Sequence, residues 1–582
     1  MGRISQCFAE LRRRHVFRVA GIYVVSAWVV LQVTDLAFAS FGIPTAGMRI
    51  VWFALIACFP LAVFWGWRYD ITPKGIVRTP PAAGGEALDL KLQTPDFIII
   101  SALAGIVLFV LAGTANEIWR LPQTIGERYA LNRNVISSIA VLPFENLSGD
   151  AADNYLSAGM HDALITSLAK VTAFKVISRT STLRLSRKLT IPEIGERLGV
   201  DKVIEGTVTR DDEDIRINIK LIDTERAEHI WSESYVRSFD SLVSLQNEIA
   251  TSVASAVQVR LTPEEMRRLE SRGNVNPATY DTYLRAMYRI RRETGKGMQE
   301  AMQLLMDTVE NDPTSALAWA GLAYGYGELG HSPFPEQDAY PRAKAAADRA
   351  LELDPDLAEA HLAVAMYRMY YEWDFAAAEQ AFEKAVQINP SLVNAHYHLA
   401  WLFELYGRDE DAIRLGELTK ELDPLSPFYS GWLAEQYRDA GMFDEAIEEA
   451  EATFGLRKNY PVANLVLGET YADLGEFDKA IEYHERLRDN YYWSYALAAT
   501  LGAAGRTEEA LDIAKKYEKD GDSLVLVLIY ASMQDYDAAY TWLLKAREDK
   551  IPWYPWLLKW YPQTRGFHDD PRVVELAEEL GL

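Results

Sequence analysis

The chain is 582 residues long and carries a formal charge of −24, from 59 Lys and Arg against 83 Asp and Glu. At about 150 residues per domain, this length excludes a single-core protein and predicts three or four structural units. The acidic balance disfavours nucleic acid as a partner, because phosphate backbones are bound by clustered Lys and Arg. An apolar content of 49% excludes global disorder. Both cysteines, Cys7 and Cys58, lie near the N-terminus, so the rest of the chain has no disulfide framework or cysteine zinc site.

Three apolar stretches, at about 16–39, 50–67 and 97–115, crowd the first 120 residues. Each approaches the roughly 20 residues that an α-helix needs to cross the core of a bilayer. The sequence therefore predicts three transmembrane helices within residues 1–120, with the lipid bilayer as a partner, followed by a linker at 121–133.

Basic residues indicate the orientation of these helices. Arg12, Arg13 and Arg14 precede the first stretch and several Lys and Arg separate the second from the third, whereas the short first loop carries Arg49 alone. The positive-inside rule then places the N-terminal tail in the cytoplasm and everything after about residue 120 across the membrane. A cleaved signal peptide is the alternative, but the first apolar stretch exceeds the roughly 7–15 residues of such a signal, which favours an uncleaved helix.

Residues 8–20, and the segment 64–76 that begins Phe-Trp-Gly-Trp, resemble the membrane segment of proteobacterial proteins that carry a TolB-like domain and tetratricopeptide (TPR) repeats. The resemblance implies a bacterial inner membrane, with the large C-terminal part in the periplasm. Such relatives often place an adenylate cyclase or a winged-helix domain on the cytoplasmic side. Because only a short tail precedes the first apolar stretch here, that output activity is not expected in this chain.

Residues 134–262 alternate strand and helix patterns, which predicts a compact α+β domain. Apolar residues with period two at 215–221, behind the acidic turn 211–214, indicate an antiparallel hairpin with the strand at 203–208. The other expected elements are strands at 139–142, 174–178 and 229–235 and helices at 156–171 and 242–261.

The same domain resembles the TolB N-terminal-like domain over its whole length, through residues 138–150, 194–206 and 231–235. That resemblance implies an envelope interaction domain without defined chemistry. Asn146 to Asp150 are turn formers, which favours an ordinary turn over the alternative of a ligand-binding loop.

Glycines at 407, 441 and 475 recur at the roughly 34-residue period of TPR repeats. Prolines follow nearly the same interval at 355, 390 and 424. The sequence therefore predicts an all-α TPR solenoid over residues 275–550, with about eight helical pairs, and a capping segment at 551–582. The aromatic run 551–560 is expected to cover the last repeat, because every solenoid must shield its terminal core; a surface anchor is the alternative.

The TPR resemblance implies that set positions of each first helix face a concave groove. Carried over residue by residue, it places ten side chains there: Tyr324, Tyr367, Tyr370, Tyr371, Tyr397, Trp401, Glu404, Glu435, Arg438 and Glu469. Such an aromatic stripe offers stacking area for an extended protein or peptide partner, and we expect these groove side chains to be partly exposed. In the alternative, some of these tyrosines pack against neighbouring helices.

The sequence contains no recognisable catalytic, cofactor-binding or metal-binding motif, which predicts a protein that is not an enzyme and uses no cofactor. His396 and His398 are two apart on a predicted helix and cannot readily chelate one ion. Ser101 and Gly105 form a small-residue pair in the third apolar stretch, a pattern typical of helix pairing, so a homo-oligomer is one expected state.

Taken together, these patterns predict a membrane-anchored periplasmic scaffold that binds partner proteins or peptides in a TPR groove. The alternative is a sensory or regulatory subunit that passes a periplasmic signal to a separate cytoplasmic effector, an adenylate cyclase or a transcription regulator.

Overall fold

A computed structural model describes Tyr23, the segments 69–72 and 75–78, and residues 137–582. The last range has short gaps at 151–152, 187, 212–213, 239–240, 271–275, 291–295, 332–337 and 560–564. The chain forms two compact units, residues 1–125 and 126–582. Apart from Tyr23, which is helical, the three predicted transmembrane stretches lie outside the described residues. Within the described ranges, every helix is too short or too polar to cross a membrane.

The first unit contains a small antiparallel hairpin, formed by β1 (Tyr69–Thr72) and β2 (Gly75–Arg78). The hairpin follows the second predicted transmembrane stretch.

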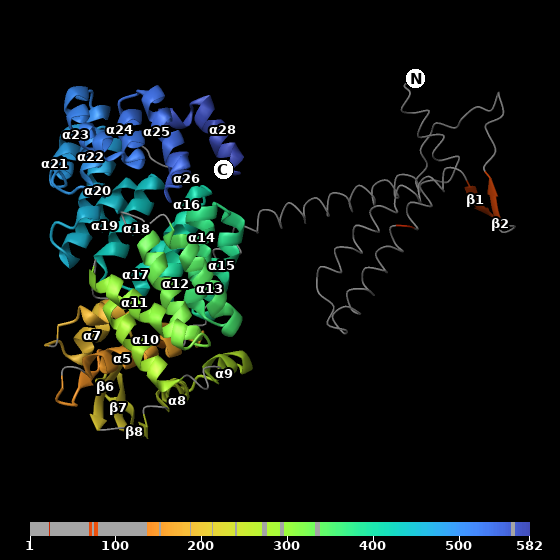
Figure 1. The fold of residues 1–582 in the computed structure, drawn as a ribbon, viewed down its shortest axis with the longest axis vertical. Coiled ribbons are helices and arrows are strands. Elements are labelled where there is room, and N and C mark those ends of the chain that lie inside the picture. The colour runs from red at the N-terminus through yellow and green to blue at the C-terminus, as the bar shows by residue number, and fades with distance from the viewer. Residues whose placement is uncertain are drawn as a thin grey trace, which may run out of the picture. The chain divides into compact units, whose positions relative to one another are not determined.

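The second unit begins with an α+β domain whose mixed sheet has the strand order β5-β3-β6-β7-β8, with β4 beside β6 (Figure 1). Strands β5, β3 and β6 are parallel, and β6, β7 and β8 are antiparallel. The strands are β3 (Ser137–Val141), β4 (Glu145–Asn146), β5 (Phe174–Val176), β6 (Lys202–Asp211), β7 (Asp214–Asp223) and β8 (His229–Ser238). The helices are α5 (Asn154–Ala169), α6 (Arg179–Leu183), α7 (Ile191–Leu198), α8 (Leu242–Ala256) and α9 (Pro263–Glu270). The predicted α+β class and the β6–β7 hairpin are confirmed.

Hydropathy patterns explain which faces of the sheet are covered. Strand β3 is buried along its whole length, because α5 and α8 cover one face of the sheet and α7 covers the other. In β7 the period-two residues Ile215, Ile217 and Ile219 are buried, while Arg216 and Lys220, which have the opposite parity, are exposed. One face of this outer part of the sheet therefore packs on the core and the other faces solvent.

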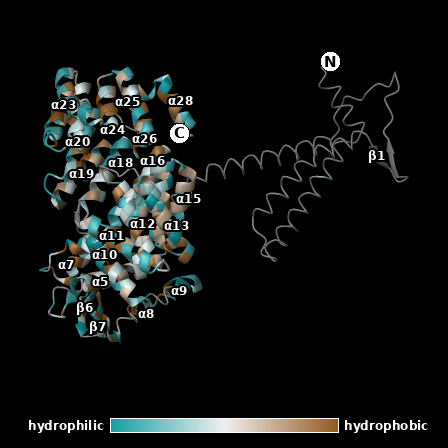
Figure 2. Ribbon diagram, in the orientation of Figure 1, coloured by the Kyte–Doolittle hydropathy of each residue, from teal (hydrophilic) through white to brown (hydrophobic). Residues whose placement is uncertain are grey.

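A helical array follows, in which eight antiparallel helix pairs run from Pro277 to Glu548 (Figure 1). The pairs are α10 (Pro277–Ile290) with α11 (Lys296–Asn311), α12 (Ala316–Gly330) with α13 (Ala339–Leu353), α14 (Ala358–Tyr367) with α15 (Phe375–Ile388), α16 (Val393–Leu405) with α17 (Asp409–Leu422), α18 (Pro427–Asp439) with α19 (Phe443–Leu456), α20 (Pro461–Asp473) with α21 (Phe477–Glu485), α22 (Ser494–Ala503) with α23 (Thr507–Asp520), and α24 (Ser523–Ser532) with α25 (Tyr536–Glu548). Three short helices end the chain: α26 (Tyr554–Leu557), α27 (Arg565–His568) and α28 (Pro571–Glu579). Apolar and polar residues are interspersed along the array helices, as amphipathic packing requires (Figure 2). The predicted TPR-type array is confirmed.

The α+β domain and the array pack against each other at several places, among them a close helix crossing and a buried polar junction. At the first, α5 crosses α10, and their residues share one hydrophobic core. Gly159 on α5 faces Leu284 on α10 so closely that an added Cβ would lie 2.9 Å from the Leu284 side chain. Glycine at this position is what allows the two helices to approach.

The second contact joins α6 to the turn between α17 and α18. The Ser181 hydroxyl donates to the Asp423 carboxylate and accepts from the backbone N–H of Leu425 at 2.8 Å. The N–H of Ser178 donates to the carbonyl of Leu422 at 2.8 Å. Ser181 is fully buried, so this polar junction is sealed from water. Through both contacts the domain and the array form one packed body.

Candidate functional site

Seven of the ten predicted groove side chains are buried rather than open to solvent. Tyr324, Tyr367 and Tyr371 keep partial exposure. The buried ones are Tyr370, Tyr397, Trp401, Glu404, Glu435, Arg438 and Glu469. The expectation of a partly exposed stripe is therefore wrong for these seven.

The C-terminal aromatic segment, residues 553–557, covers the aromatic part of this surface. The Trp401 ring lies 5.3 Å from Trp553 and 6.3 Å from Trp556, between ring centroids. Tyr370 stacks on Trp556 at 5.7 Å, and Trp556 is fully buried. Helix α26 thus lies beside α16, which belongs to the fourth helix pair and is distant in the chain, as Figure 1 also shows.

The same segment also packs on the end of the array, as expected of a cap. Tyr554 and Leu557 share a hydrophobic core with α24, α25 and α28. The expected cap is therefore present, whereas the alternative of a surface anchor disagrees with the complete burial of Tyr554 and Trp556.

Trp373 contacts this segment from a turn in which later repeats have a glycine. In later repeats the turn between the two helices of a pair holds a glycine with positive φ, as at Gly407 and Gly441. Trp373 occupies the equivalent position one repeat before Gly407 and adopts the same left-handed conformation, with φ of 59°, at the end of a π-helical turn over Arg368–Glu372. A left-handed conformation costs a bulky residue about 1–2 kcal/mol. The indole offsets this cost by packing against the Tyr554 ring, at 5.0 Å between ring centroids and tilted by 33°.

The polar half of the predicted groove is a buried charge cluster around Arg438. The Arg438 guanidinium has no solvent-exposed side-chain surface and pairs with Glu435 at 3.0 Å, with Asp439 at 2.8 Å and with Glu469. Burial raises the pKa of Asp439 to about 7, although the Arg438 charge lowers it. Burial also raises the pKa of Glu404 and of Glu435 well above the usual range of a carboxyl. Several carboxyls share one cation here, and Asp439 is partly protonated near neutral pH.

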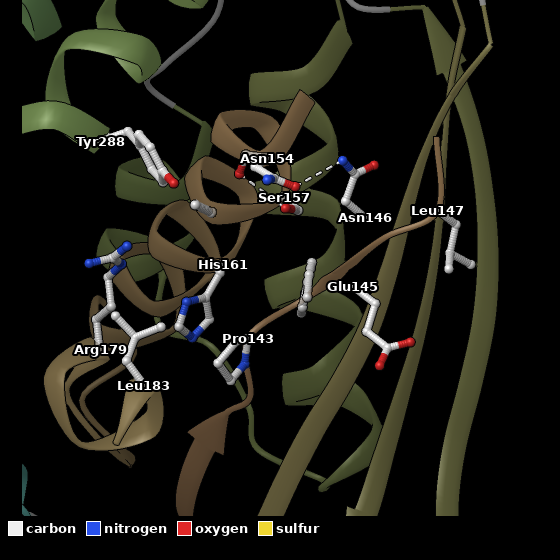
Figure 3. A pocket seen from close by; sticks show the side chains of 12 residues that line it. Pro143, Glu145, Asn146, Leu147, Asn154, Ser157, His161, Arg179, Leu183 and Tyr288 are labelled. Carbon is white, nitrogen blue, oxygen red and sulfur yellow. Dashed lines mark hydrogen bonds between the residues drawn. The ribbon is translucent and has the colours of Figure 1, made fainter. Parts of the chain in front are cut away.

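A pocket opens in the α+β domain where strand β3 ends (Figure 3). Its volume is about 400 Å³. It is lined by Pro143, Phe144, Glu145, Asn146, Leu147, Asn154, Ser157, Ala158, His161, Arg179, Leu183 and Tyr288. These residues come from the segment after β3, from α5, from α6 and from α10, so both the domain and the array contribute to the walls.

The loop after β3 is held in place by its own side chains. The Asn146 amide donates to the Asp150 carbonyl at 2.8 Å and to the Asn154 side chain at 3.0 Å, while its oxygen accepts from the N–H of Ser148. The Ser148 hydroxyl in turn accepts from the N–H of Arg210 on β6 at 2.8 Å. The turn expected at 146–150 is present, and it forms one wall of the pocket.

His161 lines the pocket and is almost completely buried. Its Nε2 lies 2.8 Å from the carbonyl oxygen of Val141, which can only accept, so Nε2 carries the proton. Sequence reasoning missed His161, Arg179 and Tyr288, because no local spacing connects three residues that meet only when α5, α6 and α10 pack together.

Within the described residues, no group of three or more His, Cys, Asp or Glu side chains is arranged to hold a metal ion. The candidate sites in the described residues are the covered aromatic surface, the Arg438 cluster and the pocket.

Comparison with known proteins shows that the α+β domain is similar to a domain of transcriptional regulators. Residues 135–252 match the family model of the second domain of HilA/YgeH-like transcriptional regulators, and residues 462–487 match a tetratricopeptide repeat model. The match to the HilA/YgeH-like domain covers the stretch for which the sequence suggested a TolB N-terminal-like domain.

Curated relatives have two different outputs. The chain is 38% identical over 187 residues to putative adenylate cyclase 3 of Rhizobium meliloti, across 32% of each protein. It is 22% identical over 316 residues to the transcriptional regulator HilA of Salmonella typhimurium, across 51% of this chain and 55% of HilA. The chain thus spans about a third and about half of the lengths of these relatives.

Solved structures similar to the chain include two repeat proteins. PilW, a type IV pilus biogenesis factor, is 21% identical and matches 39% of this chain and all of its own, with a TM-score of 0.33. YrrB, a TPR protein with an unusual peptide-binding site, is 20% identical and matches 33% of this chain and 96% of its own, with a TM-score of 0.26.

The covered aromatic surface predicts a large stability effect. We expect Trp401→Ala to lower the free energy of unfolding by about 3–5 kcal/mol, because it removes a buried indole that contacts Trp553 and Trp556. Leu474→Ala is the control: Leu474 is 44% exposed, so its truncation should change stability by less than about 1 kcal/mol. Thermal and denaturant unfolding of the two variants measures the difference. Equal midpoints would show that the C-terminal segment does not fill this surface.

The Arg438 cluster predicts a pH dependence. Asp439 has a higher pKa in the folded chain than when unfolded, so the folded state binds the extra proton and stability falls as pH rises from about 4 to 7. Asp439→Asn cannot ionise, so it should flatten this slope in melting temperatures measured between pH 5 and 8. Asp512→Asn, at a side chain that is 73% exposed, should keep the wild-type slope. A wild-type slope in Asp439→Asn would contradict the assignment.

Proposed function

We propose that this chain is a non-enzymatic regulatory protein that binds protein partners through its TPR array and controls a separate effector. The observation that supports this most directly is its similarity to two regulatory proteins with different outputs, a transcriptional regulator and a putative adenylate cyclase. Because these two relatives have different outputs, the part that both share with this chain is more consistent with a regulatory module than with an output domain. The HilA/YgeH-like match at 135–252 supports the same interpretation.

The packing of the α+β domain on the array provides a path by which a structural change in one could reach the other. A change in the domain reaches α10 through the close crossing at Gly159, and reaches the turn after α17 through Ser181 and Asp423. Because both contacts are buried, movement of one part changes the energy of the other. Partner binding and the state of the domain are coupled in this proposal.

The location is also part of the proposal. The three apolar stretches and the distribution of basic residues support an anchor in a bacterial inner membrane, with the residues after about 120 in the periplasm. The effector, an adenylate cyclase or transcription regulator, would then be cytoplasmic, and the membrane helices would carry the signal.

The scaffold hypothesis has less support. An open peptide groove needs accessible side chains, whereas Tyr397 and Trp401 are buried in the chain's own core. Protein partners would then use other surfaces of the array, where Tyr367 and Tyr371 stack with partial exposure.

Cross-linking in the native bacterium, followed by mass spectrometry of the captured proteins, separates the two hypotheses. A full-length tagged chain should capture a cyclase-type or transcription-regulator-type effector. An unrelated tagged membrane protein at equal abundance is the control for chance capture. If the chain captures envelope proteins and no effector, the regulatory proposal is wrong and the scaffold hypothesis replaces it.

A further inference from the structure

We propose that the pocket at the end of β3 binds a small organic anion, one that joins a phosphate group to an aromatic ring. The proposal goes beyond the regulatory function and does not depend on which effector is captured. It rests on the position of the pocket, the charge in its wall and the shape of its apolar surface.

The position is one at which α/β sheets generally bind ligands. Strand β3 lies between two parallel neighbours, β5 and β6, and the chain leaves β3 through residues 143–147, which line the pocket. In sheets of this kind, ligands bind beyond the carboxyl ends of the parallel strands. A volume of about 400 Å³ falls in the range of small-molecule sites, about 300–1,000 Å³.

The wall of the pocket favours an anion. Arg179 extends from α6 to the same side of the pocket as His161 and Tyr288, while Glu145 points away from these three (Figure 3). A guanidinium can bind a phosphate through two parallel hydrogen bonds. The Asn154 amide adds a neutral donor to the lining from the first turn of α5, since its oxygen already accepts from Asn146.

Apolar surface in the same pocket favours a ring. Phe144, Leu183 and Tyr288 supply apolar surface from three separate elements, and Phe144 is fixed because its ring packs against Gly206 and His161. Aromatic walls of this kind stack on planar ligand groups. The network around Asn146 holds the loop without a ligand, so little ordering is required on binding.

A ligand in this pocket would also contact the α5–α10 crossing, through which the proposed regulation passes. Tyr288 belongs to α10 of the array, whereas the remaining lining residues belong to the α+β domain. Near the pocket, the Tyr155 hydroxyl of α5 donates to Asp281 of α10 and accepts from Arg285 at 2.9 Å. A ligand that contacts both elements would stabilise this crossing.

Binding of AMP and of phenyl phosphate to the full chain in mild detergent, measured by calorimetry, tests the proposal. At least one should bind with a dissociation constant below about 1 mM. Adenosine, which lacks the anion, and inorganic phosphate, which lacks the ring, should each bind at least tenfold more weakly.

Three variants locate the binding. Arg179→Gln should weaken binding at least tenfold, and Ala158→Leu, which fills the cavity, should abolish it. Arg184→Gln is the matched control, because Arg184 ends the same helix but does not line the pocket. Melting temperatures establish that each variant is folded. The proposal is overturned if neither organic phosphate binds, if inorganic phosphate or adenosine binds equally well, or if Ala158→Leu binds like the wild type. These binding results are independent of the cross-linking experiment, so a failure of the pocket proposal can be distinguished from a failure of the regulatory proposal.

Discussion

The close contact between the α+β domain and the first array helix governs the arrangement of the second unit. Gly159 lets α5 approach Leu284 of α10, and around this crossing Tyr155, Asp281 and Arg285 form a partly buried polar network. Burial, together with the hydrogen bond to Asp281, raises the pKa of Tyr155, so the phenol stays protonated and keeps donating. The pocket exists because of this crossing, since α5 and α10 form two of its walls.

The other end of the array is closed by the C-terminal aromatic segment. The ring contacts of Trp553 and Trp556 with Tyr370 and Trp401 bring the C-terminal segment onto the π-helical turn after α14 and onto α16. In an open solenoid each repeat contacts its neighbours alone, so stability is roughly a sum over repeats. Here contacts between the C-terminal segment and distant repeats add to that sum, and the covered aromatic surface becomes part of the protein core.

Much of the fold could be predicted from the sequence, because its signals are local. The period-two run at 215–221 identified β7, and the regular interval from Gly407 to Gly441 gave the repeat length. The burial of Trp401 could not be predicted, since its partners Trp553 and Trp556 are distant in the chain and lie outside the repeat pattern. The residues of the Arg438 cluster could be listed from the sequence, but their burial could not, because it depends on the packing of α18 against α20.

The candidate pocket was still harder to predict. The loop at 146–150 carries a local turn signal, which gave the turn but not its neighbours. Arg179 and Tyr288 join it from α6 and α10, two helices that are separated from the loop and from each other by other elements of the chain. The charge of Arg179 and the apolar surface of Tyr288 come together only in the folded chain. No spacing in the sequence predicts that they meet.

The central claim is that the α+β domain and the array form one cooperative body. Hydrogen exchange of the full chain, followed by mass spectrometry, tests it most directly, with Ser181→Ala as the perturbation and Ser244→Ala, at an exposed serine of α8, as the control. The account predicts that removing the buried Ser181 hydroxyl lowers protection in β3 and α5 as well as in α17 and α18, because all belong to one unit. Faster exchange confined to α6 and its immediate contacts, with array and sheet unchanged, would contradict it.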